Sequence, residues 1–112
     1  AGAPKLSLAL AAGRPTPVAR VDTICDGLMT PAVGQLTFPV IRERLAGHAA
    51  VTDAEVVAAM RALRDELGWV VEPSGAVTVA ALLAGKVRPA GPAVAVISGG
   101  HVDPDRFAAL VA

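Results

Sequence analysis

The sequence predicts an α/β protein in which an open, mainly parallel sheet is flanked by helices. Residues 93–97 form a continuous apolar run, rich in β-branched side chains and bounded by Gly-Pro before and Gly-Gly after, which is typical of a buried strand. From Thr52 onward the patterns alternate helix, strand, helix, strand, helix, an order that favours a parallel sheet. The 112 residues, 54% of them hydrophobic, suffice for one domain with a core.

The first half of the chain predicts two helices joined by irregular segments. Residues 4–12 carry leucines among alanines and are followed by Gly13, a typical helix stop. Residues 21–28 are short and irregular, and they end in an Asp-Gly turn signal. A second helix is expected from Thr37, which would cap it, to Gly47, which would end it.

The second half of the chain contains the predicted alternation of helices and strands. Thr52 and Glu55 fit a capping box, in which each side chain accepts a hydrogen bond from the other residue's backbone amide, and the helix continues at helical spacing to Gly68. Residues 69–71 predict a short buried strand. Residues 76–84 predict a small-residue helix that ends at the next glycine.

Ser98 follows the predicted strand at residues 93–97 directly. Open α/β sheets bind ligands at the carboxyl ends of their strands, so this hydroxyl is placed where chemistry is expected. Gly99 and the next glycine allow the backbone to approach a ligand closely, and Asp103 is expected to cap a final helix whose first residue is Pro104. An ordinary strand-to-helix turn explains the same residues equally well.

Glu72 is the only carboxylate that directly follows an apolar strand, so we expect it at the same sheet edge as Ser98. It would act as an acid or base if burial raised its pKa. Alternatively, its carboxylate simply accepts hydrogen bonds from nearby backbone amides.

Other chemically capable residues carry weaker signals. Neither His48 nor His101 is spaced to pair with another metal ligand, so no metal site is predicted and both histidines are expected in loops, although His101 is near enough to contact a ligand at the strand end. Cys25 has no partner that would activate it and is interpreted as a small buried filler. Lys5 and Lys86 are expected to be solvated charges, and no glycine-rich phosphate loop occurs.

Charge and composition exclude several classes of function. Lys plus Arg equal Asp plus Glu at ten each, which leaves no basic footprint for nucleic acid. The single cysteine favours a cytoplasmic compartment, and these residues show no basic leader pattern or long apolar run, so export is not expected. The missing initiator Met and the abrupt start predict that the chain is a segment of a longer polypeptide.

Three segments in a fixed order carry a resemblance to a known family. Residues 26–28 with 34–39 have the sequences Asp-Gly-Leu and Gly-Gln-Leu-Thr-Phe-Pro, residues 71–76 have Val-Glu-Pro-Ser-Gly-Ala, and residues 97–103 have Ile-Ser-Gly-Gly-His-Val-Asp. In that order the chain resembles the C-terminal part of the threonine/serine dehydratase and serine racemase group. These are pyridoxal-phosphate enzymes of the tryptophan synthase β-like fold.

The resemblance implies that residues 1–112 are the C-terminal portion of the large cofactor-binding domain, with no complete second domain. The lysine that forms the Schiff base and the phosphate loop of relatives precede this region, so the remainder of the same enzyme is the expected partner, with a homodimer when complete. By the same resemblance Ser98 would hydrogen-bond the pyridine nitrogen of pyridoxal 5'-phosphate, with Gly99 beside it and Glu72 in the pocket wall. A neutral hydroxyl does not force that nitrogen to stay protonated.

Two positions depart from the family's pattern. His101 stands where many relatives have asparagine. Ala3 would offer a carbonyl to a divalent cation held by some relatives, but Lys5 replaces an acidic or small polar ligand there. A lysine repels a cation, so we expect Lys5 to weaken or replace that metal.

The sequence leaves three functional hypotheses. The first is a lyase that eliminates water from L-threonine or L-serine to give a 2-oxo acid and ammonia, of which this segment alone would be inactive. The second keeps the cofactor but performs racemisation, as in serine racemase, or β-replacement. The third is a free-standing, non-catalytic α/β module that binds a small ligand or a partner chain.

Overall fold

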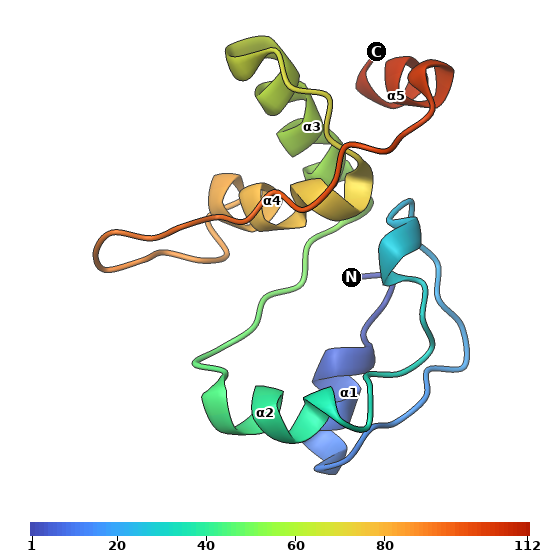
Figure 1. Ribbon diagram of the computed structural model, residues 1–112, viewed down its shortest axis with the longest axis vertical. Coiled ribbons are helices and arrows are strands. Elements are labelled where there is room, and N and C mark those ends of the chain that lie inside the picture. The colour runs from blue at the N-terminus through green and yellow to red at the C-terminus, as the bar shows by residue number, and fades with distance from the viewer.

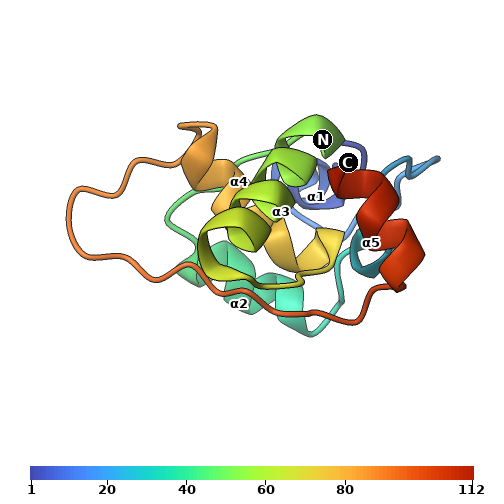
Figure 2. The same cartoon turned by 90° about the horizontal axis from the view of Figure 1, so that it is seen from above.

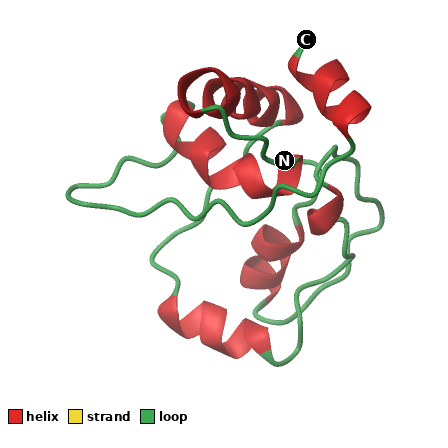
Figure 3. Ribbon diagram, turned by 45° about the horizontal axis from the view of Figure 1, so that its top comes forward, coloured by secondary structure: helices red, strands yellow, loops and turns green.

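The computed structural model describes residues 1–112 and contains helices and loops but no strand (Figures 1 and 3). The elements in chain order are α1 (Lys5–Ala12), the 3-10 turn η1 (Asp26–Leu28), α2 (Thr37–Arg44), α3 (Asp53–Leu67), the 3-10 turn η2 (Pro73–Ala76), α4 (Val77–Leu83) and α5 (Pro104–Val111). Helices α3, α4 and α5 lie together at one end of the molecule, and α1 with α2 lie at the other. Seen from above, the molecule is flattened (Figure 2), with extents of 40 × 35 × 20 Å.

The core lies where α3 packs against α4, α5 and η2. On α3 the buried side chains are spaced three or four residues apart, as one helix face requires, and they include Val56, Met60 and Leu63. Phe107 and Val111 of α5 cover them from one side. Only 14 of the 112 residues are buried, so much of the apolar surface of this chain is uncovered.

The helix boundaries predicted from glycine and capping residues are largely confirmed. Helices α1 and α3 end at Gly13 and Gly68, and both glycines have φ of 69°. At the start of α3 the reciprocal capping box of Thr52 and Glu55 is present. The Asp103 side chain accepts a hydrogen bond from Arg106 N at 2.9 Å and caps α5.

The expectation for α2 is wrong at both ends. Leu36 is the capping residue, and Thr37 is already helical, because its hydroxyl donates to the Gly34 carbonyl at 3.2 Å instead of accepting an amide of the helix. The helix ends at Arg44, before Gly47, because Leu45 is already in the extended region.

The two predicted strands are not confirmed in this chain, where both segments are loops. A strand is defined by a ladder of backbone hydrogen bonds, and no backbone-to-backbone hydrogen bond involves residues 88–98. In residues 69–71 only Trp69 N has such a partner, the Leu63 carbonyl. Both segments are non-helical, as their apolar patterns predict, but no neighbouring segment pairs with them.

The side chains of residues 94–97 nevertheless alternate in burial. Val94 and Val96 are 89% and 64% exposed, whereas Ala95 and Ile97 are half-buried and Ile97 packs on the core. The Thr78 hydroxyl of α4 donates to the Val96 carbonyl at 2.7 Å. The segment therefore has one face against the helical layer and one bare face, the periodicity of a strand covered on one side.

Candidate functional site

The ends of the two predicted strands meet at one place. A cavity of about 440 Å³ lies between them and is lined by Trp69, Val70, Val71, Ile97, Ser98, Gly99 and Gly100. Glu72 N donates to the Gly99 carbonyl at 3.1 Å, which fixes the two segments side by side. Ser98 is exposed on this wall, so its hydroxyl is accessible to a ligand.

Glu72 lies against the turn that follows Ser98, near this residue as expected, although the two segments form no sheet edge and Glu72 does not line the cavity. Its Oε2 accepts a hydrogen bond from His101 N at 3.1 Å. A Cβ built on Gly99 would lie 2.5 Å from the Glu72 carboxyl carbon, closer than real Cβ atoms come to any neighbour. Only glycine at position 99 allows the carboxylate to sit here.

Two further glycines are required by contact with backbone atoms. A Cβ on Gly75 would lie 2.7 Å from the Gly99 carbonyl oxygen and 2.9 Å from its nitrogen. A Cβ on Gly100 would lie 2.9 Å from the Val70 carbonyl oxygen. The segments around Val70, Gly75 and Gly99–Gly100 therefore approach one another closely through their backbones. A side chain on any of these glycines would not fit between them.

The η1 turn joins the same cluster through Ser74, a contact that sequence reasoning missed. Gly27 N donates to Ser74 Oγ at 2.9 Å, and the Ser74 hydroxyl lies 3.4 Å from Asp26 Oδ1. Arg106 of α5 supports this turn, since its guanidinium lies 3.6 Å from Asp26 Oδ2 and donates to the Ile24 carbonyl at 3.2 Å. No local pattern marked Ser74 or Arg106, because their partners are far away in the sequence.

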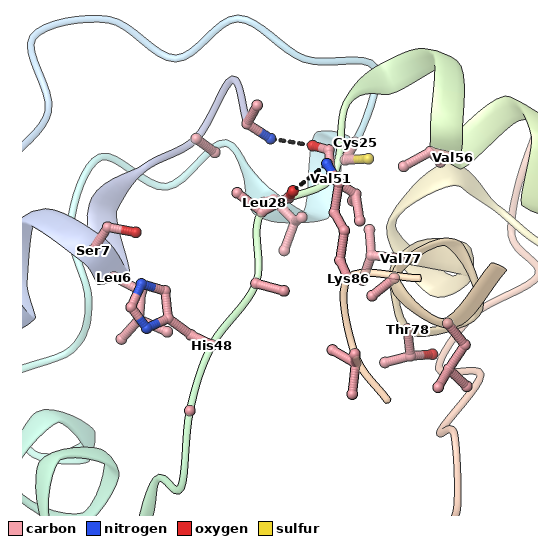
Figure 4. Close-up of a pocket in the computed structure, with 18 of the residues that line it drawn as sticks. Leu6, Ser7, Cys25, Leu28, His48, Val51, Val56, Val77, Thr78 and Lys86 are labelled. Atoms are coloured by element: carbon pink, nitrogen blue, oxygen red, sulfur yellow. Dashed lines mark hydrogen bonds between the residues drawn. The ribbon is translucent and has the colours of Figure 1, made fainter. Parts of the chain in front are cut away.

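A larger cavity lies elsewhere and is not lined by Ser98, Gly99 or Glu72 (Figure 4). Its volume is about 970 Å³, and 19 of its 29 lining residues are hydrophobic. Figure 4 shows its wall, where Leu28 and His48 lie on one side and Lys86 on the other. An apolar lining of this kind suits packing against polypeptide better than binding a charged group.

Both lysines line this larger cavity and form hydrogen bonds there. Lys86 is exposed, as expected of a solvated charge, whereas Lys5 is partly buried, which differs from that expectation. Lys86 Nζ lies 2.8 Å from Glu55 Oε2 and donates to the Ala50 carbonyl at 2.7 Å. Lys5 Nζ donates to the Leu28 carbonyl, and burial lowers the pKa of its ammonium group. Neither lysine lines the cavity beside Ser98.

Cys25 is buried in the core, as predicted, and burial raises the pKa of its thiol. A protonated thiol is a poor nucleophile, so this residue has no catalytic character. Both histidines are exposed. No cluster of three or more His, Cys, Asp or Glu side chains is arranged to hold a metal ion, and none of the helices has the length and apolarity needed to span a bilayer.

Comparison with known proteins identifies the family of this chain. Residues 1–99 match the family described as pyridoxal-phosphate dependent enzyme. The chain is 41% identical over 90 residues to L-threo-3-hydroxyaspartate ammonia-lyase of a Pseudomonas species, covering 80% of this chain and 28% of the relative. It is 35% identical over 109 residues to the biosynthetic L-threonine dehydratase of Mycobacterium tuberculosis, covering 96% of this chain and 25% of the relative.

Solved structures agree with the sequence matches. The backbone matches maize serine racemase with a TM-score of 0.81 at 33% identity, covering 96% of this chain and 36% of that one. The chain thus spans about a quarter of the length of the curated relatives described above, 28% and 25%. Because the family match extends over residues 1–99, this chain belongs to the family of pyridoxal-phosphate dependent enzymes.

Proposed function

We propose that residues 1–112 are the C-terminal part of the large cofactor-binding domain of a threonine/serine ammonia-lyase. The complete enzyme would eliminate water from L-threonine or L-serine and release a 2-oxo acid and ammonia. The observation that carries the proposal is that Ser98 and Gly99 line one cavity while Glu72 is hydrogen-bonded to the turn beside them. The relatives of this chain include a threonine dehydratase and a hydroxyaspartate ammonia-lyase.

The residues present suit one edge of the cofactor ring. Ser98 is exposed, and Gly99 and Gly100 beside it have no side chains, so a flat heterocycle has access to the hydroxyl. When bound, pyridoxal 5'-phosphate supplies the electron sink that the reaction needs. The Ser98 hydroxyl would hydrogen-bond the ring nitrogen without imposing a charge on it, which suits loss of a β-hydroxyl because the carbanion need survive only briefly.

The rest of the enzyme would supply what this chain does not. The Schiff-base lysine and the phosphate loop would come from the remaining part of the large domain, since Lys5 and Lys86 are both engaged at the other cavity. Segments 69–71 and 93–97 would become strands of a mainly parallel sheet in that domain, their bare valine faces covered by it. By the resemblance, the complete enzyme would be a homodimer in which Lys5 weakens or replaces the metal of some relatives. The single cysteine favours a cytoplasmic compartment for it.

The test compares Ser98 variants of the complete enzyme. We expect Ser98→Ala to retain the fold and to lose about tenfold or more in deaminase turnover, the effect of removing one functional hydrogen bond. Ser98→Thr keeps a hydroxyl and should recover part of the rate. Unchanged turnover in Ser98→Ala would refute the role assigned to this residue.

Serine racemisation is the second candidate, favoured by the backbone match to maize serine racemase. Analysis of the products from L-serine separates the two activities, because a lyase yields a 2-oxo acid and ammonia whereas a racemase yields D-serine. A chain that binds no cofactor when joined to the rest of its enzyme would instead favour a non-catalytic binding module.

A further inference from the structure

We propose that Glu72 is a positioning residue whose carboxylate holds the turn at residues 99–101, so that Ser98 faces the cofactor site, and that it takes no part in proton transfer. This inference rests on the proposed function and assigns a role to a residue whose chemistry the sequence left open between acid, base and hydrogen-bond acceptor.

Glu72 holds the turn from both of its ends. Its backbone N donates to the Gly99 carbonyl at 3.1 Å, and its Oε2 accepts a hydrogen bond from His101 N at 3.1 Å. One residue therefore bonds both sides of Gly100. The turn has only one other backbone bond of its own, from Val102 N to the Gly100 carbonyl at 3.1 Å.

The carboxylate also fills the space beside the turn. A Cβ at Gly99 would lie 2.5 Å from both Cδ and Oε1 of Glu72, so the carboxyl group occupies the place where a side chain of residue 99 would be. Gly99 directly follows Ser98. Movement of the carboxylate would therefore free the backbone next to the hydroxyl.

Little else on the amino-terminal side of Ser98 fixes its position. Residues 88–98 make no backbone-to-backbone hydrogen bond. On the other side of Ser98, Gly99 and Gly100 belong to the most flexible residue type. The segment 93–98 is held to the helical layer by the hydrogen bond from the Thr78 hydroxyl to the Val96 carbonyl at 2.7 Å and by the packing of Ile97 on the core. The position of Ser98 in this chain depends on Glu72 more than on any other single side chain on its carboxyl-terminal side.

The contacts favour a hydrogen-bond acceptor over a proton carrier. A backbone N–H needs only an oxygen lone pair, which the amide oxygen of glutamine also offers. A general acid or base, in contrast, needs a proton that can come and go. Glutamine at position 72 therefore keeps the hydrogen-bond acceptor and removes the acid or base. Alanine removes both.

The experiment uses the complete enzyme with Glu72→Gln, Glu72→Ala and Ser98→Ala, and with Glu66→Ala, an exposed glutamate at the end of α3, as the matched control. The readouts are turnover, the pH profile of kcat/KM, the absorption spectrum of the bound cofactor, and hydrogen exchange of the His101 amide.

We expect Glu72→Ala to lose about tenfold or more in turnover, because a misplacement of about 1 Å in a site is costly. It should shift the cofactor spectrum as Ser98→Ala does and accelerate exchange of the His101 amide. Glu72→Gln should keep the shape of the pH profile and recover most of the loss. Combining Glu72→Ala with Ser98→Ala should add little to Ser98→Ala alone, because the first residue acts through the second.

Three results would overturn the inference. The first is a Glu72→Gln variant whose turnover is as low as that of Glu72→Ala, or whose pH profile of kcat/KM has lost one limb. The second is a Glu72→Ala variant with the same turnover as Glu66→Ala. The third is a double variant in which the losses of turnover from Glu72→Ala and Ser98→Ala add fully. Failure of the proposed function looks different, because Ser98→Ala itself would then leave both turnover and spectrum unchanged, and the role of Glu72 would fall with it.

Discussion

At the scale of single residues, the structure around Ser98 requires glycine at certain positions as strictly as it requires particular side chains at others. A Cβ added to Gly75 would lie too close to the Gly99 backbone, and a Cβ added to Gly99 would lie too close to the Glu72 carboxyl group. Gly91, in the loop before residues 93–97, has nothing within 4 Å of an added Cβ. The three positions therefore separate the effect of contact from the general effect of replacing a glycine.

We predict that Gly75→Ala in the complete enzyme weakens cofactor binding and lowers turnover, because its Cβ would meet the Gly99 backbone at 2.7 Å and push the turn away from Glu72. A titration with pyridoxal 5'-phosphate followed by its absorbance measures the change. Gly91→Ala should bind the cofactor like the parent enzyme. Equal affinities for all three proteins would show that the close approach of these turns has no role in the site.

The residues of this site were predictable only where the signal is local. Ser98, Gly99 and Glu72 each follow an apolar run, and their order along the chain carries the family resemblance. Ser74 Oγ accepts a hydrogen bond from Gly27 N, 47 positions away, and Arg106 donates to the carbonyl of Ile24, 82 positions away. Such contacts are set by how the elements pack, and a spacing rule within one segment contains no information about them.

At the scale of elements, α3 is the helix with the most complete N-terminal cap. Glu55 belongs to the capping box with Thr52 and also pairs with Lys86 at 2.8 Å, which joins the start of α3 to the residues after α4. The hydrogen bond from Lys86, followed by that from the Thr52 amide, lowers the pKa of the Glu55 carboxyl from its usual 4.5.

This depressed pKa predicts a pH dependence of stability. A carboxylate whose pKa is lower in the folded protein stabilises the fold above its unfolded pKa of 4.5 and loses that contribution as pH falls through the folded value. We expect the difference in unfolding temperature between the parent enzyme and Glu55→Gln to be constant near neutrality and to shrink below pH 4.5. Glu66→Gln serves as the control without these partners, and a difference that does not change with pH would contradict the prediction.

The helices were predictable and the strands were not, for a physical reason. A cap such as that of Asp103 or a stop such as Gly68 acts within a few residues, so the sequence contains the whole signal. Even so, the cap of α2 was assigned one residue too late, at Thr37. A strand requires a partner, and residues 93–97 have none among the described residues.

At the scale of the whole molecule, the uncovered apolar surface is the feature that most needs explanation. Val94 and Val96 are 89% and 64% exposed, and Trp69 and Val70 are about half exposed at 52% and 53%. Exposed apolar side chains of this size are typical of an interface where they gather on one face. The chain spans a quarter of the length of its relatives, which supports the proposal that the rest of the enzyme covers this face.

Hydrogen exchange tests this account of the bare face. The amides of residues 93–97 lack backbone partners, so we expect them to exchange rapidly in the isolated chain and to be strongly protected in the complete enzyme, where a sheet would pair them. Residues 88–91, in the same loop but outside the apolar run, should exchange rapidly in both. Rapid exchange of residues 93–97 in the complete enzyme would show that they form no strand there.

The central claim is that the Ser98 hydroxyl meets the ring nitrogen of pyridoxal 5'-phosphate. The most direct measurement is the distance between Ser98 Oγ and that nitrogen in a crystal structure of the complete enzyme with its cofactor. The account predicts a hydrogen bond of about 2.6–3.2 Å. A separation beyond about 4 Å, or a ring nitrogen held by a carboxylate from elsewhere in the enzyme, would contradict it.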